Sequence, residues 1–248
     1  APVRYLVVSD LHANWEALDA VLRHARGKYD KTVCCGDLVG YGADPDIVTR
    51  WVHGNVAAVV RGNHDKACAG MEDLEWFNPV ARISAMWTQV AAKPPTIAYL
   101  KSLPKGPESV DGFQILHGSP LDEDEYVLSE REAAMMAPYL EKAVSFFGHT
   151  HIQGGFWFRR NAVKSLRSPS LASDSETLEL ENGIDYLINP GSVGQPRDGD
   201  PRAAYAIYEP EQRLVTFWRA AYDVRSAQEK ILSAGLPEIL AYRLESGS

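Results

Sequence analysis

Five short segments place histidine, aspartate or asparagine directly after a run of β-forming residues. These segments are Asp10-Leu11-His12, Gly36-Asp37, Gly62-Asn63-His64-Asp65, His117-Gly118 and Gly148-His149-Thr150-His151. Taken singly, each is explained by a turn or by a hydrogen-bonded polar residue. Taken together they hold five of the seven histidines, which ordinary turns do not explain. Because ligands collect at the carboxyl ends of strands in α/β sheets, we expect the segments to converge on one site.

The side chains in these segments are typical ligands of divalent metal ions. Imidazole nitrogens, carboxylates and one amide oxygen are the candidate donors, supplied by Asp10, His12, Asp37, Asn63, His117, His149 and His151. One metal needs about three or four protein ligands, so seven favour two metals that share a carboxylate. Two neighbouring cations bind a phosphoryl oxygen and lower the pKa of a bound water, which suits hydrolysis at phosphorus. These donors leave manganese, iron, zinc and nickel open.

The composition limits the partners of the chain. The formal net charge is -8, with 25 Lys and Arg against 33 Asp and Glu, which argues against extended nucleic-acid binding. A small anionic substrate is still compatible with this charge, because bound cations reverse the local field. The acidic run at 122–125 is expected to be a solvated face.

The same sequence predicts a cytoplasmic protein without membrane attachment. No apolar run approaches the ~20 residues of a membrane span, and the N-terminus shows no secretory signal. The three cysteines indicate no disulfide framework. Cys34 and Cys35 are predicted to be core residues, and Cys68 an incidental thiol.

The elements that must position the candidate ligands alternate at first between strand and helix. Strands are predicted at 3–9, 31–35 and 56–60. Helices are predicted at 14–26, with Asn14 as the N-cap, and from Asp44-Pro45 onward. This order implies parallel strand pairing and a layered α/β core.

The rest of the chain is predicted to be mainly helical at 64–104 and rich in strands after residue 154. The expected strands are 114–116, 144–147, 156–158, 177–180, 186–188, 204–208 and 214–218, and further helices are expected at 129–136 and 224–233. The stretch 165–175 is expected to be a loop, and Trp76, Trp87 and Trp157 to be core residues. We predict one α/β domain, residues 1–248, as a four-layer α-β-β-α sandwich of two mixed sheets flanked by helices.

The order of the motifs resembles the calcineurin-like metallophosphoesterase superfamily, and its small bacterial and archaeal phosphodiesterases in particular. The motifs that carry the resemblance are Ser9-Asp10-Leu11-His12, Gly36-Asp37-Leu38-Val39-Gly40, Gly62-Asn63-His64-Asp65, His117-Gly118 and Gly148-His149-Thr150-His151. The stretch from Asn189 to Arg197 is similar to a late loop of these enzymes. The resemblance spans roughly residues 3 to 219.

The resemblance implies a role for each candidate ligand. Asp10, His12 and His151 would hold one metal. Asn63, His117 and His149 would hold the other, and Asp37 would bridge both. One departure is Ala13, which stands where these enzymes commonly have glycine. It removes no ligand, so we expect activity to survive.

Several polar residues near the ligands have open roles. The resemblance makes His64 a proton donor to the phosphate or the leaving oxygen. Asp65 would orient the His64 imidazole and raise its pKa, or else be a charge at a helix N-terminus, and both roles remain open. Arg61 is expected to form a surface ion pair, Arg197 to contact the substrate, and Tyr41 to pack over its loop.

These features predict a metal-dependent phosphoesterase of the phosphodiesterase type, in which a hydroxide bridging two divalent metals attacks phosphorus. The expected partner is a small phosphate ester. Two alternatives stay open: a non-catalytic protein-interaction module of the same fold, and a nuclease. The physiological substrate, the preference for monoesters or diesters and the oligomeric state are not predicted.

Overall fold

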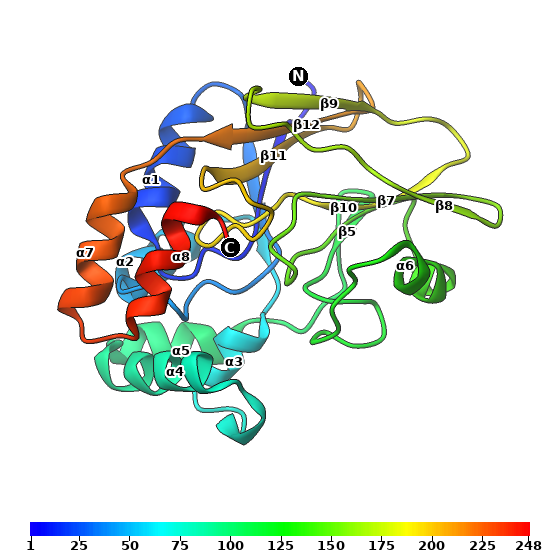
Figure 1. Cartoon of the computed structure of the whole chain (residues 1–248). Coiled ribbons are helices and arrows are strands. Elements are labelled where there is room, and N and C mark those ends of the chain that lie inside the picture. The colour runs from blue at the N-terminus through cyan, green and yellow to red at the C-terminus, as the bar shows by residue number, and fades with distance from the viewer.

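Two six-stranded mixed sheets pack face to face in the computed structural model, which describes residues 1–248 (Figure 1). The first sheet has the order β3 (Ala58–Val59), β2 (Lys31–Cys34), β1 (Tyr5–Val8), β11 (Ala203–Glu209), β12 (Leu214–Ala220), β9 (Ser175–Glu179). The second has the order β4 (Glu108–Val110), β5 (Phe113–Ile115), β6 (Val144–Phe146), β10 (Asp185–Asn189), β7 (Gly154–Arg159), β8 (Ala162–Ser165).

Helices cover the outer face of each sheet. They are α1 (Trp15–His24), α2 (Pro45–Asn55), α3 (Asn63–Cys68), α4 (Pro79–Ala91), α5 (Pro94–Ser102), α6 (Glu130–Met136), α7 (Val224–Ser233) and α8 (Glu238–Ser246), with two short 3-10 helices, η1 (Leu74–Trp76) and η2 (Ala137–Tyr139). Helices α1 and α2 pack on the first sheet, and α6 packs on the second from the opposite side (Figure 1). The predicted four-layer α-β-β-α sandwich is therefore confirmed.

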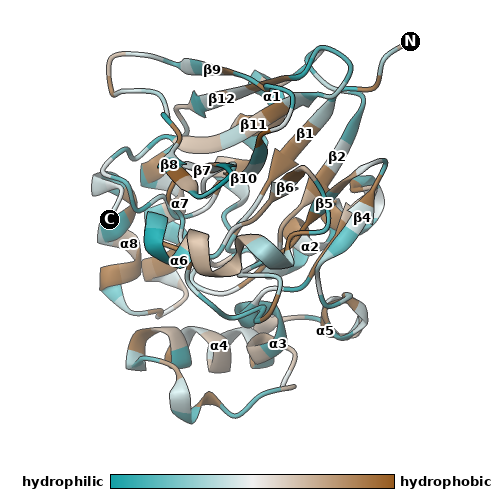
Figure 2. Ribbon diagram, turned by 90° about the vertical axis from the view of Figure 1, so that its right-hand side faces the viewer, coloured by the Kyte–Doolittle hydropathy of each residue, from teal (hydrophilic) through white to brown (hydrophobic).

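The side-chain alternation of β1 explains the layering. Tyr5 and Val7 are buried between the sheets, in one cluster with Phe113 and Phe146 of the second sheet. Leu6 and Val8 point the other way, because successive side chains of a strand face opposite sides. They join the helices in a separate cluster. Strands buried on both faces are nearly all apolar, and the central strands are accordingly brown in Figure 2.

Parallel pairing sets the positions of the strand ends. Strands β1, β2 and β3 are parallel neighbours, as predicted from the order of the first sixty residues. In the second sheet β6 pairs in parallel with both β5 and β10. The loops that follow parallel strands leave the sheet at one edge. The motif-bearing loops of both sheets can therefore meet.

Some elements differ from the prediction. The chain forms β4, β8 and α8, which were not predicted. Trp76 is not a core residue, since it lies on η1 with 89% of its surface exposed. Trp87 and Trp157 are partly buried against core clusters. Asn14 caps α1 as predicted, because its side chain accepts from the backbone N–H of Ala17 at 3.1 Å.

All three cysteines lie in the interior of the protein. Cys34, Cys35 and also Cys68 are fully buried and unpaired. Cys68 is thus a core residue and not an incidental thiol. Every helix is too short or too polar to span a lipid bilayer.

Candidate metal centre

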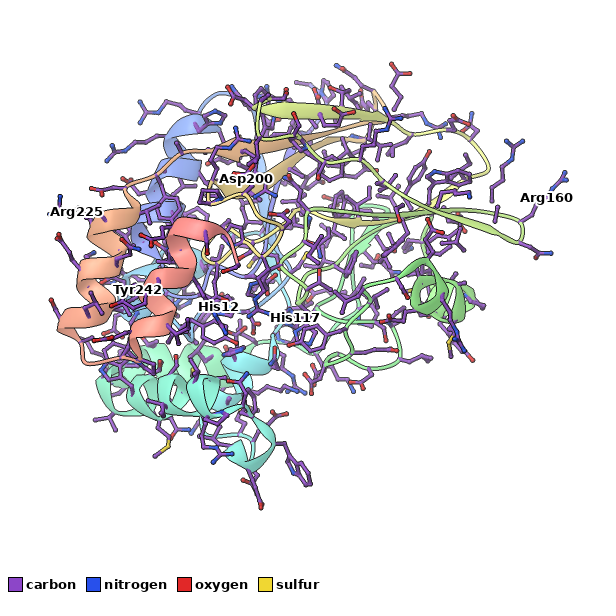
Figure 3. The ribbon with its side chains drawn as sticks, in the orientation of Figure 1. His12, His117, Arg160, Asp200, Arg225 and Tyr242 are labelled. Carbon is purple, nitrogen blue, oxygen red and sulfur yellow. The ribbon has the colours of Figure 1, made fainter.

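The loops after the parallel strands bring all seven candidate ligands together. Figure 3 shows His12 and His117, from different sheets, near each other in the interior. The potential ligand atoms form two groups, and within each group they all lie within 4.8 Å of one another. The first group is Asp10, His12, Asp37 and His151, and the second is Asp37, His117 and His149. The amide oxygen of Asn63 lies 3.3 Å from Nε2 of His117. Asp37 is common to both groups.

The backbone at these loops is strained. Five of the seven candidate ligands have positive φ angles: Asp10 (53°), His12 (44°), Asp37 (56°), His149 (73°) and His151 (61°). Such left-handed conformations cost non-glycine residues about 1–3 kcal/mol each and gather at functional sites. The sharp turns direct the side chains of neighbouring loops toward one point.

Backbone carbonyls determine which nitrogen three of the imidazoles present to the centre. Nδ1 of His12 contacts the carbonyl of Val39 at 2.9 Å, and Nδ1 of His151 contacts that of Gln195 at 2.6 Å. Nδ1 of His117 lies 2.7 Å from the carbonyl oxygen of Cys35. Because a carbonyl can only accept, each Nδ1 carries the proton and each Nε2 is left with a lone pair. Histidines that bind metals are commonly held in this way.

His149 is oriented through its other nitrogen. Its Nε2 donates to the carbonyl of Asp124 at 2.9 Å, which leaves Nδ1 as the nitrogen with a free lone pair. The imidazole also stacks on Tyr126, with 3.7 Å between ring centroids and an interplanar angle of 20°. The loop that contains Asp124 and Tyr126 therefore fixes this ring.

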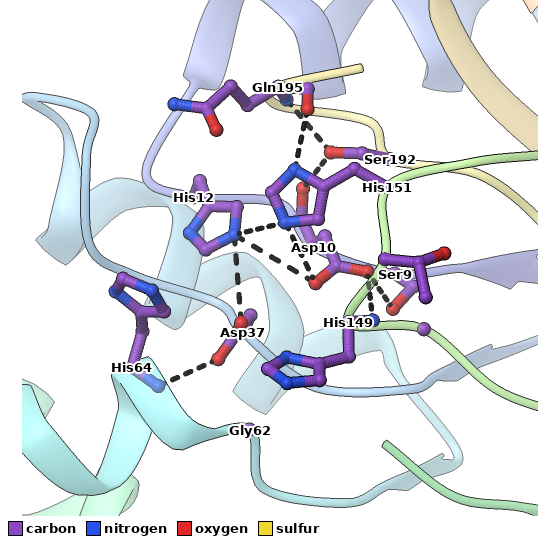
Figure 4. A network of polar contacts seen from close by, with 12 residues as sticks. Ser9, Asp10, His12, Asp37, Gly62, His64, His149, His151, Ser192 and Gln195 are labelled. Carbon is purple, nitrogen blue, oxygen red and sulfur yellow. Dashed lines mark hydrogen bonds and ion pairs between the residues drawn. The ribbon is translucent and has the colours of Figure 1, made fainter. Parts of the chain in front are cut away.

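The converging atoms are acceptors without donors. Oδ1 of Asp10 and Oδ2 of Asp37 are buried and have no hydrogen-bond partner. Nε2 of His12 and Nε2 of His151 are only 3.0 Å apart, although neither carries a proton in the neutral tautomers deduced above. Burying such groups unpaired is costly. Figure 4 shows this arrangement. Nitrogen and oxygen donors of this kind suit first-row divalent ions, so the residues fit a binuclear metal site.

The electrostatics of the centre also favour a cation. Burial alone would raise the pKa values of Asp10 and Asp37, but the imidazoles of His151 and His117 hold both below their usual range. Burial lowers the pKa of His117, yet the Asp37 carboxylate outweighs it and raises that pKa to about 10. This raised pKa reflects the excess of negative charge around the His117 ring, which a bound cation would offset.

Two other imidazoles are held neutral by burial. Burial lowers the pKa of His12 well below its usual value. Burial, together with the neighbouring His117, lowers the pKa of His149 to about 3. Because only the neutral imidazole can bind a metal, both rings are in the form that ligation requires at neutral pH.

Asp65 does not contact the His64 imidazole, contrary to one of its expected roles. Its Oδ2 accepts from the backbone N–H groups of Gly62 at 2.8 Å and Asp37 at 2.9 Å, and its Oδ1 accepts from Leu38 at 2.8 Å. Asp65 thus caps α3 and holds the turn that carries Asp37. Burial lowers the pKa of His64 to about 4, so this pKa is not raised as the resemblance implied.

His64 lies beside the cluster and at the floor of an open cleft. Its backbone N–H donates to Oδ1 of Asp37 at 2.9 Å, while its side-chain Nδ1 is buried without a partner. The ring lies 4.4 Å from the ring of Tyr41 and 5.0 Å from that of His12. Tyr41 is buried between these groups, so its predicted packing role is confirmed.

The two arginines have different surroundings. Arg61 pairs with Glu123 at 2.8 Å, so the predicted ion pair forms, but it is half-buried and not at the surface. Arg197 donates to the hydroxyl of Tyr41 at 3.3 Å and to Oε1 of Gln195 at 2.9 Å, and its guanidinium lies 5.7 Å from the centre of the Tyr41 ring. Arg197 is therefore close to the candidate metal centre and lies against the outer side of Tyr41.

The loop at 119–126 contributes to the site, although no motif in the sequence marks it. The acidic run within it is not simply a solvated face, since Glu123 and Asp124 bind the buried ammonium of Lys66 at 3.1 and 2.8 Å. Lys66 also binds Glu72 at 2.8 Å. These ion pairs attach the loop to α3, which begins at Asn63. No sequence signal links the partners, because they are 57 and 58 residues apart.

Comparisons with known proteins agree with this fold and this centre. The chain belongs to the calcineurin-like phosphoesterase superfamily, whose domain model matches residues 3–213. It is 34% identical over 252 residues to the uncharacterized protein MJ0912 of Methanocaldococcus jannaschii, covering 97% of each chain.

Solved structures extend this relationship. A metallophosphoesterase from Sphaerobacter thermophilus is 41% identical, with a TM-score of 0.85 over 100% of both chains. The hypothetical protein PH1004 of Pyrococcus horikoshii OT3 has a TM-score of 0.79 over 99% of both chains at 19% identity, which is a likeness of fold alone. The resemblance to the superfamily drawn from the motifs is confirmed.

Replacing Gly62 should disturb the turn around Asp37. An added Cβ would lie 2.0 Å from Oδ1 of Asp37, so Gly62→Ala is expected to lower the free energy of unfolding by about 1–3 kcal/mol. Urea denaturation measures the change. Gly54→Ala is the control, because a Cβ there meets nothing within 4 Å and alanine should stabilise α2 by about 0.5–1 kcal/mol. Equal effects of the two substitutions would contradict this account.

Removing the ammonium of Lys66 should leave three carboxylates without their shared cation. Lys66→Met is expected to cost about 3–5 kcal/mol, because a partner of a buried ion pair is lost. The Lys66 side chain is 6% exposed. Lys31→Met removes the exposed pair with Asp111 (47% and 57% exposed) and should cost less than about 1 kcal/mol. Thermal or urea unfolding of both variants tests the difference, and a Lys66→Met protein as stable as Lys31→Met would refute it.

Proposed function

We propose that this chain is a binuclear metal-dependent phosphoesterase of the phosphodiesterase type that hydrolyses small phosphate esters. The observation that carries the proposal is the shared position of Asp37 between two groups of buried potential ligands, in which Oδ1 of Asp10 and Oδ2 of Asp37 have no hydrogen-bond partner. Two cations with one bridging carboxylate would satisfy these acceptors together. The same arrangement supports the assignment of residues 1–248 to one domain, because both sheets contribute ligands.

Each group of residues would hold one cation. Asp10, His12 and His151 would hold the first, and Asn63, His117 and His149 the second, with Asp37 between them. When bound, two divalent cations supply a water of lowered pKa and neutralise the charge on the phosphoryl oxygens. Manganese, iron, zinc or nickel would suit these donors.

The remaining residues would position and protonate the substrate. His64 places an imidazole whose Nδ1 has no hydrogen-bond partner between the cluster and the open cleft. The negative charge of a bound phosphate would raise the lowered pKa of this ring, which would then donate a proton to the leaving oxygen. Tyr41 and Phe77 pack against this ring and hold its orientation. Arg197 would contact a phosphate oxygen or the ester group from the outer side of Tyr41. Asp65 would act by holding the turn that carries Asp37.

Two observations support an enzyme acting on small substrates over the alternatives. A protein-interaction module would not require a complete set of seven candidate ligands, six of them buried and five on a strained backbone. A nuclease would be expected to have a basic face, whereas this chain carries a net charge of -8. The proposal is tested by metal-dependent hydrolysis of bis(p-nitrophenyl) phosphate, and full activity in the metal-free protein would refute it.

The metal content should depend on Asp37. Elemental analysis of the manganese-loaded protein is expected to give two ions per chain, and Asp37→Asn should lose most of both, because a bridging carboxylate is removed from both groups. Asp174→Asn is the control, since its side chain is 77% exposed in an ion pair with Arg202. Two ions per chain in Asp37→Asn after dialysis would contradict the bridging role.

His64 should matter for turnover and not for metal content. His64→Ala is expected to retain both ions and to hydrolyse bis(p-nitrophenyl) phosphate about 10²–10⁴-fold more slowly, the usual contribution of a general acid. His53→Ala is the control, because His53 stacks on Tyr99, outside the centre. Turnover of His64→Ala at the level of the His53→Ala control would reject the role of His64 as a proton donor.

A further inference from the structure

A cleft of about 540 Å³ opens from the His64 side of the candidate metal centre. Asn63, His64, Asp124 and His149 line its inner end. An ester group of a phosphate held at the centre would therefore extend into this cleft. The chemistry of the cleft walls then determines which ester group fits.

Aromatic rings form much of these walls. Tyr41, Trp76, Phe77 and Tyr126 all line the cleft. Three of the rings have packing partners inside the protein: Tyr41 and Phe77 pack on His64, and Tyr126 stacks on His149. Trp76 differs, because its side chain is 89% exposed. Covering this large apolar ring of the cleft wall with a ligand removes apolar surface from water, which is favourable.

The backbone that carries Trp76 is held firmly. The guanidinium of Arg82 donates to the carbonyls of Leu74 at 3.1 Å, Glu75 at 2.9 Å and Phe77 at 3.2 Å. This segment projects from the body of the molecule between α3 and α4, in cyan in Figure 1. Trp76 is thus an exposed ring on a fixed backbone. A planar ligand that stacks on it has to order this side chain but not the segment that carries it, which limits the loss of conformational entropy.

The charges of the cleft are negative. Glu72, Asp73 and Asp124 line it, and the lining contains no lysine or arginine. Lys66, behind the wall, binds both Glu72 and Asp124 at 2.8 Å, and the guanidinium of Arg197 lies against Tyr41, but these two cations do not balance three carboxylates. A second phosphate in this cleft would be repelled, whereas an uncharged or cationic group would not.

We propose that this cleft selects phosphate esters whose ester group is a flat aromatic ring, stacked on Trp76 and free of further phosphates. The inference rests on the proposed function, since it assigns the ester-group end of the same site. The substrate class is then an aryl or nucleoside ester with a single phosphate. Substrates with polyphosphate chains are excluded by the carboxylates.

The stacking is tested by binding and does not need turnover. Isothermal titration of the manganese-loaded full chain compares phenylphosphonate with cyclohexylphosphonate, which have similar size and charge and a carbon–phosphorus bond that is not hydrolysed. The wild-type chain is expected to bind the aromatic compound about five- to tenfold more tightly. Trp76→Ala should abolish this preference, and Trp76→Phe should keep most of it.

The control is Tyr242→Ala, which removes a half-exposed aromatic residue of α8 that does not line the cleft, and it should bind like the wild type. Equal affinity of the wild type for the two phosphonates, or an unchanged preference in Trp76→Ala, would overturn the stacking role. Loss of metal-dependent phosphodiester hydrolysis is a separate result, which would overturn the proposed function itself.

The proposed exclusion of further negative charge is tested with two phenylphosphonates that carry a charged substituent on the ring. 4-Carboxyphenylphosphonate is expected to bind about fivefold more weakly than 4-(aminomethyl)phenylphosphonate, with a smaller difference at high salt. Binding of the carboxylate at least as tight as that of the amine would overturn the exclusion of further negative charge.

Discussion

The buried carboxylate of Asp37 accepts one hydrogen bond, from the backbone of His64, and leaves its other oxygen without a donor. Imidazoles of both groups approach that oxygen, with Nε2 of His117 at 3.3 Å and Nε2 of His12 at 3.6 Å. A buried anion in this position is costly unless a cation compensates it. The structure therefore tolerates Asp37 only as part of a site that binds positive charge.

The surrounding architecture maintains this arrangement. Parallel strands of both sheets end at a common edge, and strained turns direct the side chains inward from there. Asp65 holds the turn of Asp37 through the backbone N–H groups of Asp37, Leu38 and Val39, and Gly62 leaves the space that the carboxylate occupies. Backbone carbonyls select the nitrogen that each imidazole presents. The packed sheets thus provide a rigid frame, and the loops provide the chemistry.

Much of this could be predicted from the sequence, because the relevant signals are local. The parallel order of the first three strands follows from alternating strand and helix patterns. Because the motifs follow strands directly, they could be predicted to converge on one location. The structure brings all seven candidate ligands to that location, while metal binding by each of them stays a prediction. The superfamily could be recognised because its motifs are short and ordered along the chain.

Other features could not be predicted, for reasons that are physical. Hydrophobicity alone does not show whether Trp76 packs in the core or stands in a cleft. Asp65 caps a helix with the same residue type and spacing that would orient a histidine. The attachment of Asp124 to Lys66, and thereby the support of His149, joins residues distant in sequence. Strands β4 and β8 are short edge strands with a weak alternation of side chains.

The most direct test of the shared carboxylate is a crystal structure of the manganese-loaded protein with anomalous scattering data. The account predicts two anomalous peaks, one on each side of the Asp37 carboxylate, the first near His151 and the second near His117. A single peak, or peaks away from Asp37, would contradict it.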